Sequence, residues 1–298
     1  MSGDFLSRWR QRVDAALDAL LPPDSRWPQT LHRAMRYSVM AGGKRLRPVL
    51  ALAAAGACGG DLEAILPAAC GLEMVHTYSL IHDDLPALDD DDWRRGVPTC
   101  HRKFGEATAI LAGDALLTHG LECFSLHPAA AKYDGVRART AAAVAAAIGT
   151  GGMIGGQMED IEAEREPAGG ERSLARLERI HAHKTGALIR ASLAVGGLLS
   201  FAGEDVRERL DRYGAALGLA FQIKDDLLDV ESTREELGKA TGKDVAHGKM
   251  TFPGLLGLEE SRRRLAETIE TARSAARELE PDGGPLSELA GFVADRKS

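Results

Sequence analysis

The sequence predicts an all-α fold. Apolar residues recur at helical spacing through most of the chain, strand-type alternation is nearly absent, and Ala, Leu, Glu and Arg dominate the long segments, a pattern typical of helical proteins. Pro or Gly lies near many of the breaks between these segments, as expected at helix boundaries. The expected helices, in chain order, are 4–20, 28–41, 46–57, 67–84, 106–125, 136–164, 172–200, 205–230, 248–278 and 284–296.

Local signals support several of these boundaries. The helix at 46–57 follows a Gly pair, and the helix at 205–230 ends in a cluster of aspartates. Pro67 suits the first turn of a helix, where its missing N–H costs nothing. The helix that starts there should kink or end near Pro86, because proline disfavours helical backbone at the preceding residue and cannot donate a hydrogen bond to the carbonyl of His82.

Length and composition exclude several classes of protein. The 298 residues contain no Pro-, Gly- or Ser-rich linker and no shift in composition, so we expect one domain spanning 1–298. A net charge of -7 without a basic stripe argues against nucleic acid as a partner. The cysteines are widely spaced, which makes a disulfide framework or a zinc site unexpected and fits a reducing cytoplasm. They are Cys58, Cys70, Cys100 and Cys123.

No segment has the pattern of a membrane span or a secretion signal. The N-terminal apolar positions are interrupted by charges from Asp4 to Asp14, unlike the apolar core of a signal peptide. The uncharged run 141–156 is too short, and too rich in Ala and Gly, to cross a bilayer. The sequence therefore predicts a soluble cytoplasmic protein.

Two aspartate clusters end apolar runs and are each followed by Lys or Arg. They are Asp83-Asp84-Leu85-Pro86-Ala87-Leu88-Asp89 and Asp225-Asp226-Leu227-Leu228-Asp229. Carboxylates this close repel one another, which proteins tolerate most readily where cations lie between them. Magnesium prefers oxygen ligands, and water and substrate phosphates usually complete its coordination shell. The clusters therefore predict a magnesium–diphosphate site, and a solvated acidic surface is the plainer alternative.

The two clusters differ in geometry. Asp225 and Asp226 precede Asp229 by four and three residues, so the three carboxylates can share one helix face. Asp89 lies six residues beyond Asp83 and five beyond Asp84, so on a straight helix, at about 100° per residue, it would be turned away from both. We expect Asp89 to return toward the cluster from the distorted segment that follows Pro86.

Several groups of basic residues are candidate phosphate ligands. In Gly42-Gly43-Lys44-Arg45-Leu46-Arg47-Pro48, three cations lie next to a flexible Gly pair and ahead of a helix start, where unpaired N–H groups favour anions. Arg94 and Arg95 follow an acidic run and could equally balance its charge. Lysines near the second cluster could close over a phosphate or belong to a solvated loop. They are Lys239, Lys243 and Lys249, and Lys184 lies in an earlier helical segment.

These motifs strongly resemble those of the trans-isoprenyl diphosphate synthases, in the same order and over nearly the whole chain. The inserted pair of residues in the first aspartate motif resembles bacterial farnesyl and plant or bacterial geranylgeranyl synthases. The matching segments are 43–48, 73–86, 89–96, 155–157, 183–186, 221–229 and 242–244.

The resemblance implies an isoprenoid synthase fold, a helical bundle around a deep cavity with an aspartate cluster on each wall of its mouth. It further implies three Mg²⁺ ions bound with an allylic diphosphate, isopentenyl diphosphate as the second substrate, and a homodimer. The implied metal ligands or their supports are Asp83, Asp84, Asp89, Asp225, Asp226 and Asp229. The implied residues for the allylic diphosphate are Arg94, Lys184, Gln222, Lys239 or Lys243, and Lys249. Those for isopentenyl diphosphate are Gly43, Lys44, Arg47, His76 and Arg95.

The implied reaction is ionisation of an allylic diphosphate, condensation and proton loss. Metal and cationic side chains stabilise the departing diphosphate, which by family knowledge also takes the proton. The Thr185 hydroxyl and the Gln222 carbonyl can present negative dipole ends to the carbocation. His76 is the weaker candidate, because a histidine on an apolar helix is more often a core residue.

Product length rests on two residues of the first apolar helix. Tyr78 precedes Asp83 by five residues, about 7.5 Å along a helix, where its ring could close the cavity and favour the C15 product farnesyl diphosphate. Ser79 is nearer to the face of Asp83 and could leave room for a longer chain. Geranyl and geranylgeranyl synthases therefore stay open as alternatives.

Two other classes of protein are possible. A terpene cyclase would use the same ionisation but would not need the cations Lys44, Arg47 and Arg95. A non-catalytic subunit of a synthase should have lost at least one aspartate cluster, and this chain has both.

Overall fold

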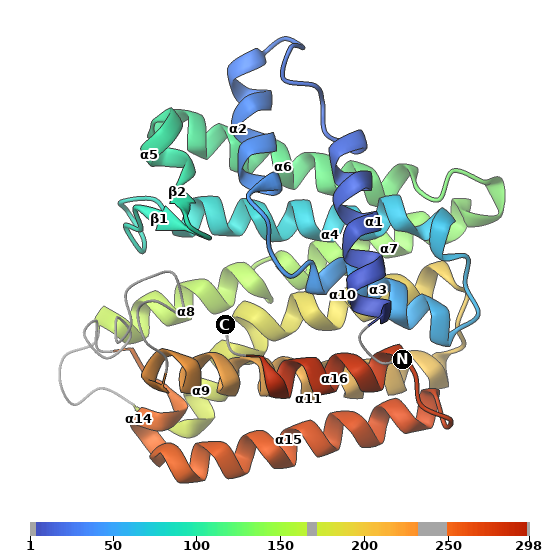
Figure 1. Ribbon diagram of the computed structural model, residues 1–298, viewed down its shortest axis with the longest axis vertical. Coiled ribbons are helices and arrows are strands. Elements are labelled where there is room, and N and C mark those ends of the chain that lie inside the picture. Colours follow the sequence, from blue (N-terminus) through green and yellow to red (C-terminus); the bar gives the residue numbers. More distant parts are fainter. Residues whose placement is uncertain (1–3, 166–171, 232–248, 297–298) are drawn as a thin grey trace.

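The computed structural model describes residues 4–165, 172–231 and 249–296. These residues form helices stacked in successive layers (Figure 1). The N-terminal half contains α1 Asp4–Leu20, α2 Gln29–Met40, α3 Leu46–Ala57, α4 Leu62–Asp83, α5 Cys100–Phe104, α6 Glu106–Leu126, the 3₁₀ turn η1 Ala131–Tyr133, and α7 Asp134–Ile148. The remainder contains α8 Met153–Arg165, α9 Leu174–His181, the π-helical turn η2 Ala182–Gly186, α10 Ala187–Leu199, α11 Glu204–Glu231, α14 Phe252–Leu256, α15 Leu258–Leu279 and α16 Pro285–Asp295.

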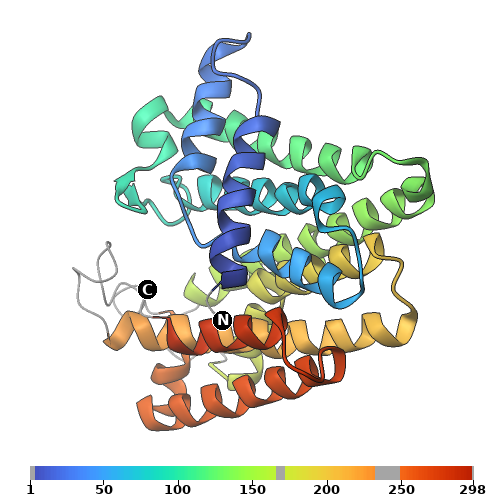
Figure 2. The same cartoon turned by 45° about the vertical axis from the view of Figure 1, so that its right-hand side comes forward.

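The layers follow a simple packing order. Helix α6 packs on α4, α4 on α3, α3 on α10, α10 on α11, and α11 on α15, with α1 and α2 crossing one end of the stack (Figures 1 and 2). Helices α4 and α6 approach closely because Gly71 and Gly120 face one another. A Cβ on Gly71 would lie 2.8 Å from the Gly120 carbonyl oxygen, and one on Gly120 would lie 2.9 Å from that of Gly71.

The predicted all-α fold is confirmed, with several boundary errors. Helix α4 begins at Leu62 rather than at Pro67, because the Asp61 carboxylate accepts a hydrogen bond from the Ala64 N–H at 3.1 Å and caps a start that is five residues earlier. Pro67 therefore lies inside the helix. The predicted end near Pro86 is correct, since α4 stops at Asp83.

Two predicted helices are interrupted, and a third is distorted. The segment 136–164 breaks between α7 and α8 at residues 149–152, and 248–278 divides at Gly257, whose φ is +80°. The segment 172–200 stays helical but widens into the π turn η2, a distortion that is frequent at functional sites. Local rearrangements of this kind leave the apolar periodicity almost unchanged, so the sequence pattern does not reveal them.

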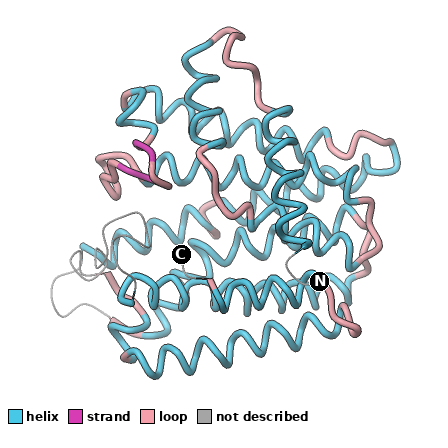
Figure 3. Tube along the Cα trace, in the orientation of Figure 1, coloured by secondary structure: helices cyan, strands magenta, loops and turns pink. Residues whose placement is uncertain are grey.

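A short hairpin was not predicted. Strands β1 Trp93–Arg94 and β2 Val97–Pro98 pair antiparallel and are drawn in magenta in Figure 3. Arg95 and Gly96 connect them with φ of 53° and 77°, the signs that a type I′ turn requires. Strands of two residues are too short to show alternation.

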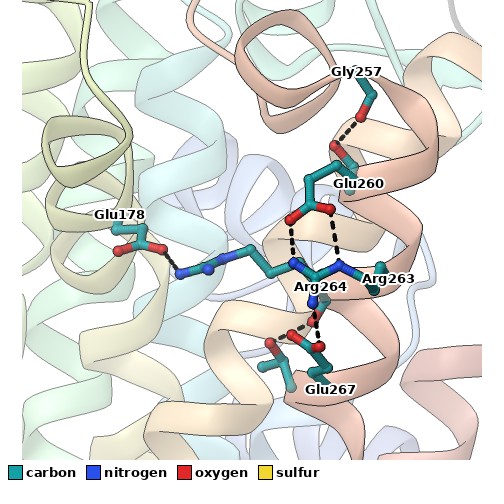
Figure 4. A network of polar contacts seen from close by, with 8 residues as sticks. Glu178, Gly257, Glu260, Arg263, Arg264 and Glu267 are labelled. Atoms are coloured by element: carbon teal, nitrogen blue, oxygen red, sulfur yellow. Dashed lines mark hydrogen bonds and ion pairs between the residues drawn. The ribbon is translucent and has the colours of Figure 1, made fainter.

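Ion pairs cover the outer surface of α15. Arg263 donates to Glu260 at 2.8 Å and also pairs with Glu267, while Arg264 joins α15 to Glu178 of α9 (Figure 4). Exposed pairs contribute about 0–1 kcal/mol each, so they solubilise this face more than they stabilise the fold.

Three stretches are long and apolar enough to cross a membrane, by length and composition alone. They are Leu62–Asp83, Glu106–Leu126 and Ala131–Arg165, with 72%, 39% and 28% of their most apolar windows buried in the protein. Helix α4 is thus a core helix. The α6 and α8 stretches leave apolar side chains exposed, namely Ile110, Leu111, Leu126, Ile154 and Met158.

Candidate active site

A cavity of about 570 Å³ opens where the end of α4 faces the end of α11. It brings together residues that lie far apart in the sequence. Its wall contains Gly43, Lys44, Arg45, Leu46, Arg47, Glu73, His76, Leu80, Asp83, Asp89, Asp91, Arg94, Arg95, Asp160, His181, Lys184, Phe221, Gln222, Asp225, Asp226, Leu228, Asp229, Lys249, Met250, Thr251 and Arg296. Both predicted aspartate clusters therefore contribute to one cavity.

The first cluster is shaped by the end of α4. The Asp89 N–H donates to the Asp83 carbonyl at 2.9 Å, and the Asp91 N–H donates to the Asp84 carbonyl at 3.2 Å. These bonds fold the chain after Pro86 back on the helix end. The expected return of Asp89 is therefore correct, and Asp91 reaches the same cavity.

Asp83 and Asp84 have different surroundings. Burial raises the pKa of Asp83 to about 6, with Asp89 and Asp84 adding to the rise and Lys184 opposing it. Asp84 is buried outside the cavity wall and accepts from Arg94 at 2.6–2.7 Å. Asp84 therefore holds Arg94 in place, whereas Asp83 lies at the cavity surface, where burial disfavours its charged form.

The second cluster lies on the last turns of α11. Asp225 pairs with Arg296 at 2.7 Å, and the same guanidinium donates to the Phe221 carbonyl at 2.6 Å and lies 3.8 Å from the Phe221 ring centroid. Asp226 is buried and accepts from the Phe252 N–H at 2.8 Å. The shared helix face predicted for the cluster is confirmed, because all its aspartates line the cavity.

A second part of the cavity is strongly cationic. The Nε of Arg47 is buried and has no hydrogen-bond partner among the described residues. Burial, with Arg95 nearby, lowers the pKa of Arg47 to about 10. Burial likewise lowers the pKa of Arg95, and burial with four neighbouring arginines lowers that of His76. The Glu73 carboxylate opposes both arginine shifts but is itself paired with Arg45 at 3.0 Å. Arg47 and Arg95 are therefore suited to bind an anion.

Backbone conformation holds these cations together. Arg95 occupies the left-handed turn of the hairpin and donates to the Gly42 carbonyl. A Cβ on Gly43 would lie 2.7 Å from the Arg95 guanidinium carbon. The missing side chain of Gly43 therefore allows the arginine to pack against the backbone.

Two lysines are paired with acids across the cavity. Lys184, in the π turn η2, pairs with Asp160 of α8 at 2.6 Å. A Cβ on Gly156 would lie 2.2 Å from the Lys184 backbone nitrogen, so this glycine permits the close packing of α8. Lys249 lies 3.8 Å from Asp89 and 3.4 Å from Glu164.

Some predicted residues lie elsewhere. Thr185, Tyr78 and Ser79 are not part of the wall of this cavity. The buried Tyr78 ring packs edge-on against His82, with centroids 5.8 Å apart, and the Ser79 hydroxyl donates to the His76 carbonyl at 2.9 Å. Lys239 and Lys243 lie outside the described residues.

The sequence did not reveal several wall residues. Asp160, His181 and Arg296 are single polar residues in helical or terminal segments, where a solvated side chain is the ordinary interpretation. Asp160 follows the Gly155-Gly156 pair by a single helical turn, which was the one available signal. The completed wall can bind anions at its arginines and cations at its carboxylates.

Comparisons with known proteins give a consistent result. The profile of a family described as "Polyprenyl synthetase" matches residues 28–281. A dimethylallyltranstransferase of Fischerella ambigua is 46% identical, covering 98% of this chain and 83% of its own. A farnesyl diphosphate synthase of Geobacillus stearothermophilus is 44% identical, covering 98% and 97%. A solved structure described as an FPP/GFPP synthase from Zymomonas mobilis has a TM-score of 0.85 at 35% identity and covers 100% of both chains.

Proposed function

The chain belongs to the polyprenyl synthetase family, and we propose that it is a prenyltransferase that condenses isopentenyl diphosphate with dimethylallyl and geranyl diphosphates to form farnesyl diphosphate. One observation carries this proposal. A single cavity combines carboxylates on two facing helix ends with a separate group of arginines, in which the Arg47 Nε has no hydrogen-bond partner among the described residues and burial lowers the pKa of Arg47 to about 10. A terpene cyclase has one diphosphate to bind, whereas this cavity has sites suited to two.

The carboxylates fit magnesium. Their donors are all oxygen atoms, as Mg²⁺ prefers, and they face one another across the cavity. Among the described residues no three His, Cys, Asp or Glu side chains converge as a ready metal site, so substrate diphosphate and water would complete the coordination. Magnesium, when bound, supplies positive charge that neutralises the allylic diphosphate as it leaves. We propose three ions, held by Asp83, Asp89, Asp225 and Asp229, with Asp84 and Asp226 in support.

The allylic diphosphate is bound beside the metal carboxylates. Arg94, Lys184 and Lys249 already face this region and are positioned to bind its oxygens. Each is paired with a carboxylate in the described structure, so its position is fixed before substrate arrives. The Gln222 carbonyl and the Thr185 hydroxyl are assigned to stabilise the allylic cation, and Lys239 or Lys243 is assigned to close over the diphosphate.

Isopentenyl diphosphate is bound by the arginine group. Arg47 and Arg95 contribute charge, Gly43 and Lys44 contribute to the adjoining wall, and His76 is held neutral by its cationic neighbours. A neutral imidazole can still donate one hydrogen bond to a phosphate oxygen.

The proposed reaction needs no protein side chain as the base. The bond between C1 and oxygen of the allylic diphosphate breaks, and the double bond of isopentenyl diphosphate attacks C1 to form a carbon–carbon bond. A proton then leaves C2 of the isopentenyl unit, and the released diphosphate accepts it. The side chains bind, orient and stabilise charge.

Product length is assigned to Tyr78. Its ring lies outside the cavity wall, is buried on α4 five residues before Asp83, and packs against His82. This packing supports a fixed side chain that limits how far the cavity extends along α4. The relatives described above are named for different reactions and products, so geranylgeranyl and geranyl diphosphate remain the alternative products.

The proposal includes a cytoplasmic homodimer in which residues 1–298 act as one domain. The cavity wall extends from Gly43 to Arg296, which supports a single functional unit. A second copy would cover apolar side chains of α6 and α8 that are about half exposed, such as Leu111 and Met158. Sedimentation at several protein concentrations tests this assignment.

The decisive experiment is a product analysis. The purified protein is incubated with Mg²⁺, labelled isopentenyl diphosphate and, separately, dimethylallyl, geranyl or farnesyl diphosphate, and the products are identified after dephosphorylation. Farnesol from the first two primers, with farnesyl diphosphate left unextended, is the expected result. Parallel reactions contain chelator or omit isopentenyl diphosphate.

Other results identify the alternatives. Geranylgeraniol keeps the enzyme class and overturns the C15 product. Hydrocarbons formed without isopentenyl diphosphate identify a terpene cyclase. The absence of any Mg²⁺-dependent turnover identifies a non-catalytic subunit.

A further inference from the structure

We propose that His181 is a positioning residue that orients the Gln222 side-chain amide, so that its carbonyl rather than its NH₂ group faces the reacting carbons. This inference rests on the proposed function, in which Gln222 stabilises the allylic cation. His181 ends α9 and is buried, yet its side chain forms part of the cavity wall.

Three contacts define the position of the imidazole ring. Its plane stacks on Phe252, with centroids 5.7 Å apart and planes inclined by 19°. Its Nε2 lies 3.7 Å from Oδ2 of Asp226, and its Nδ1 lies 3.2 Å from Nε2 of Gln222. The ring therefore connects the second aspartate cluster to the glutamine one turn earlier on α11.

Asp226 determines which nitrogen of the His181 ring carries the proton. The Phe252 backbone N–H donates to Oδ2 of Asp226 at 2.8 Å, which holds that carboxylate in place. A carboxylate beside one nitrogen of an imidazole favours the tautomer with its proton on that nitrogen. The tautomer of His181 is therefore Nε2–H, and its Nδ1 is an acceptor.

The acceptor at Nδ1 then selects one orientation of the amide. Only the NH₂ group of Gln222 can donate to Nδ1, so the carbonyl oxygen must point to the other side. Within the described part of the chain this oxygen has no hydrogen bond, and Gln222 lines the cavity. A flipped amide would present its positive N–H dipoles to a developing carbocation and would oppose its formation.

The buried environment supports this positioning role. His181 Nε2 has no partner within hydrogen-bond distance among the described residues, so the ring is held by stacking on Phe252, by the Nδ1 contact with Gln222 and by the longer contact with Asp226. A side chain kept only for packing would not need nitrogen at either position. Phenylalanine would fill a similar volume and stack on Phe252.

Two substitutions separate positioning from packing. His181→Phe keeps the ring and removes the acceptor, whereas His181→Asn removes the ring and keeps an acceptor oxygen near the position of Nδ1. We expect kcat to fall about tenfold in His181→Phe with little change in KM. The hydrogen bond that orients the Gln222 amide is lost, and the free energy of about one buried hydrogen bond corresponds to that factor in rate. We expect His181→Asn to retain kcat within about threefold while unfolding at a lower temperature. The reverse order of kcat would assign His181 to packing and overturn the proposal.

A double-mutant cycle tests the connection to Gln222. In a Gln222→Met background the amide is gone, so adding His181→Phe should change kcat less than about twofold. A further tenfold loss there would show that His181 acts independently of the amide. His32→Phe is the matched control, because His32 is also buried and its Nδ1 lies 3.0 Å from the Arg26 carbonyl, away from the cavity. It should lower the unfolding temperature without changing kcat.

A measurement without turnover keeps this inference distinct from the proposed function. Nitrogen NMR of ¹⁵N-histidine-labelled protein, with His181→Phe used to assign the signal, reports the tautomer directly. The Nε2–H form is expected, and the Nδ1–H form overturns the inference. Failure of the wild-type protein to form any prenyl product would overturn the proposed function instead, and the tautomer would still test the positioning.

Discussion

Asp83 should destabilise the metal-free protein, and replacing it by asparagine should stabilise that form. Burial raises the pKa of Asp83 to about 6, compared with an ordinary value of 3.8. A carboxyl with a higher pKa in the folded protein than in the unfolded chain opposes folding above that pKa, and the opposition fades as the pH falls from about 6 toward 3.8. Because one pKa unit corresponds to about 1.36 kcal/mol, Asp83→Asn should gain about 3 kcal/mol at pH 8 and about half of that at pH 5.

The assay is urea or thermal unfolding in the presence of a chelator at both pH values. For a chain of this size, about 3 kcal/mol corresponds to a rise of about 5 °C in the unfolding temperature. Asp24→Asn is the control, because Asp24 is exposed on a loop and its substitution should change stability by less than about 0.5 kcal/mol. Asp83→Asn should also abolish most of the extra stability that Mg²⁺ with inorganic diphosphate gives to the wild type.

Two results would refute this reasoning. One is an Asp83→Asn protein that is no more stable than the wild type at pH 8 without metal. The other is a gain that is equally large at pH 5, because titration of Asp83 would then not be its cause.

Three further predictions concern the rest of the cavity. Tyr78→Ala should lengthen the products beyond C15, read by chromatography of the dephosphorylated alcohols, and an unchanged product pattern would exclude a barrier at this position. Gly43→Ala should raise the KM for isopentenyl diphosphate about tenfold because its Cβ would collide with Arg95, while Gly42→Ala, whose Cβ would meet nothing within 4 Å, should change that KM less; equal effects would assign the loss to backbone strain. Arg296→Met should lower the Mg²⁺ concentration needed for half-maximal stabilisation by diphosphate about fivefold, since a competing cation is removed from the second aspartate cluster; an unchanged or higher requirement would contradict that competition.

The sequence predicted the helices and the two aspartate clusters because both depend on local spacing. The face shared by Asp225 and Asp229 requires only helical periodicity, and the end of α4 requires only the chemistry of Pro86. The sequence could not predict that Arg296 reaches Asp225, because that contact joins α16 to α11 across the fold. The hairpin that carries Arg95 was also missed, since its strands are shorter than any alternating pattern.

The same hairpin has a consequence for how two substrates are aligned. Arg94 ends strand β1 and pairs with Asp84, whereas Arg95 begins the left-handed turn and donates to the Gly42 carbonyl. The peptide unit between Arg94 and Arg95 thus connects the two proposed diphosphate sites and fixes the distance between them. Inserting one residue between the two arginines would change the separation of the reacting carbons while leaving each anion site chemically complete. The distance between the two anion sites is therefore set by the conformation of this one peptide unit.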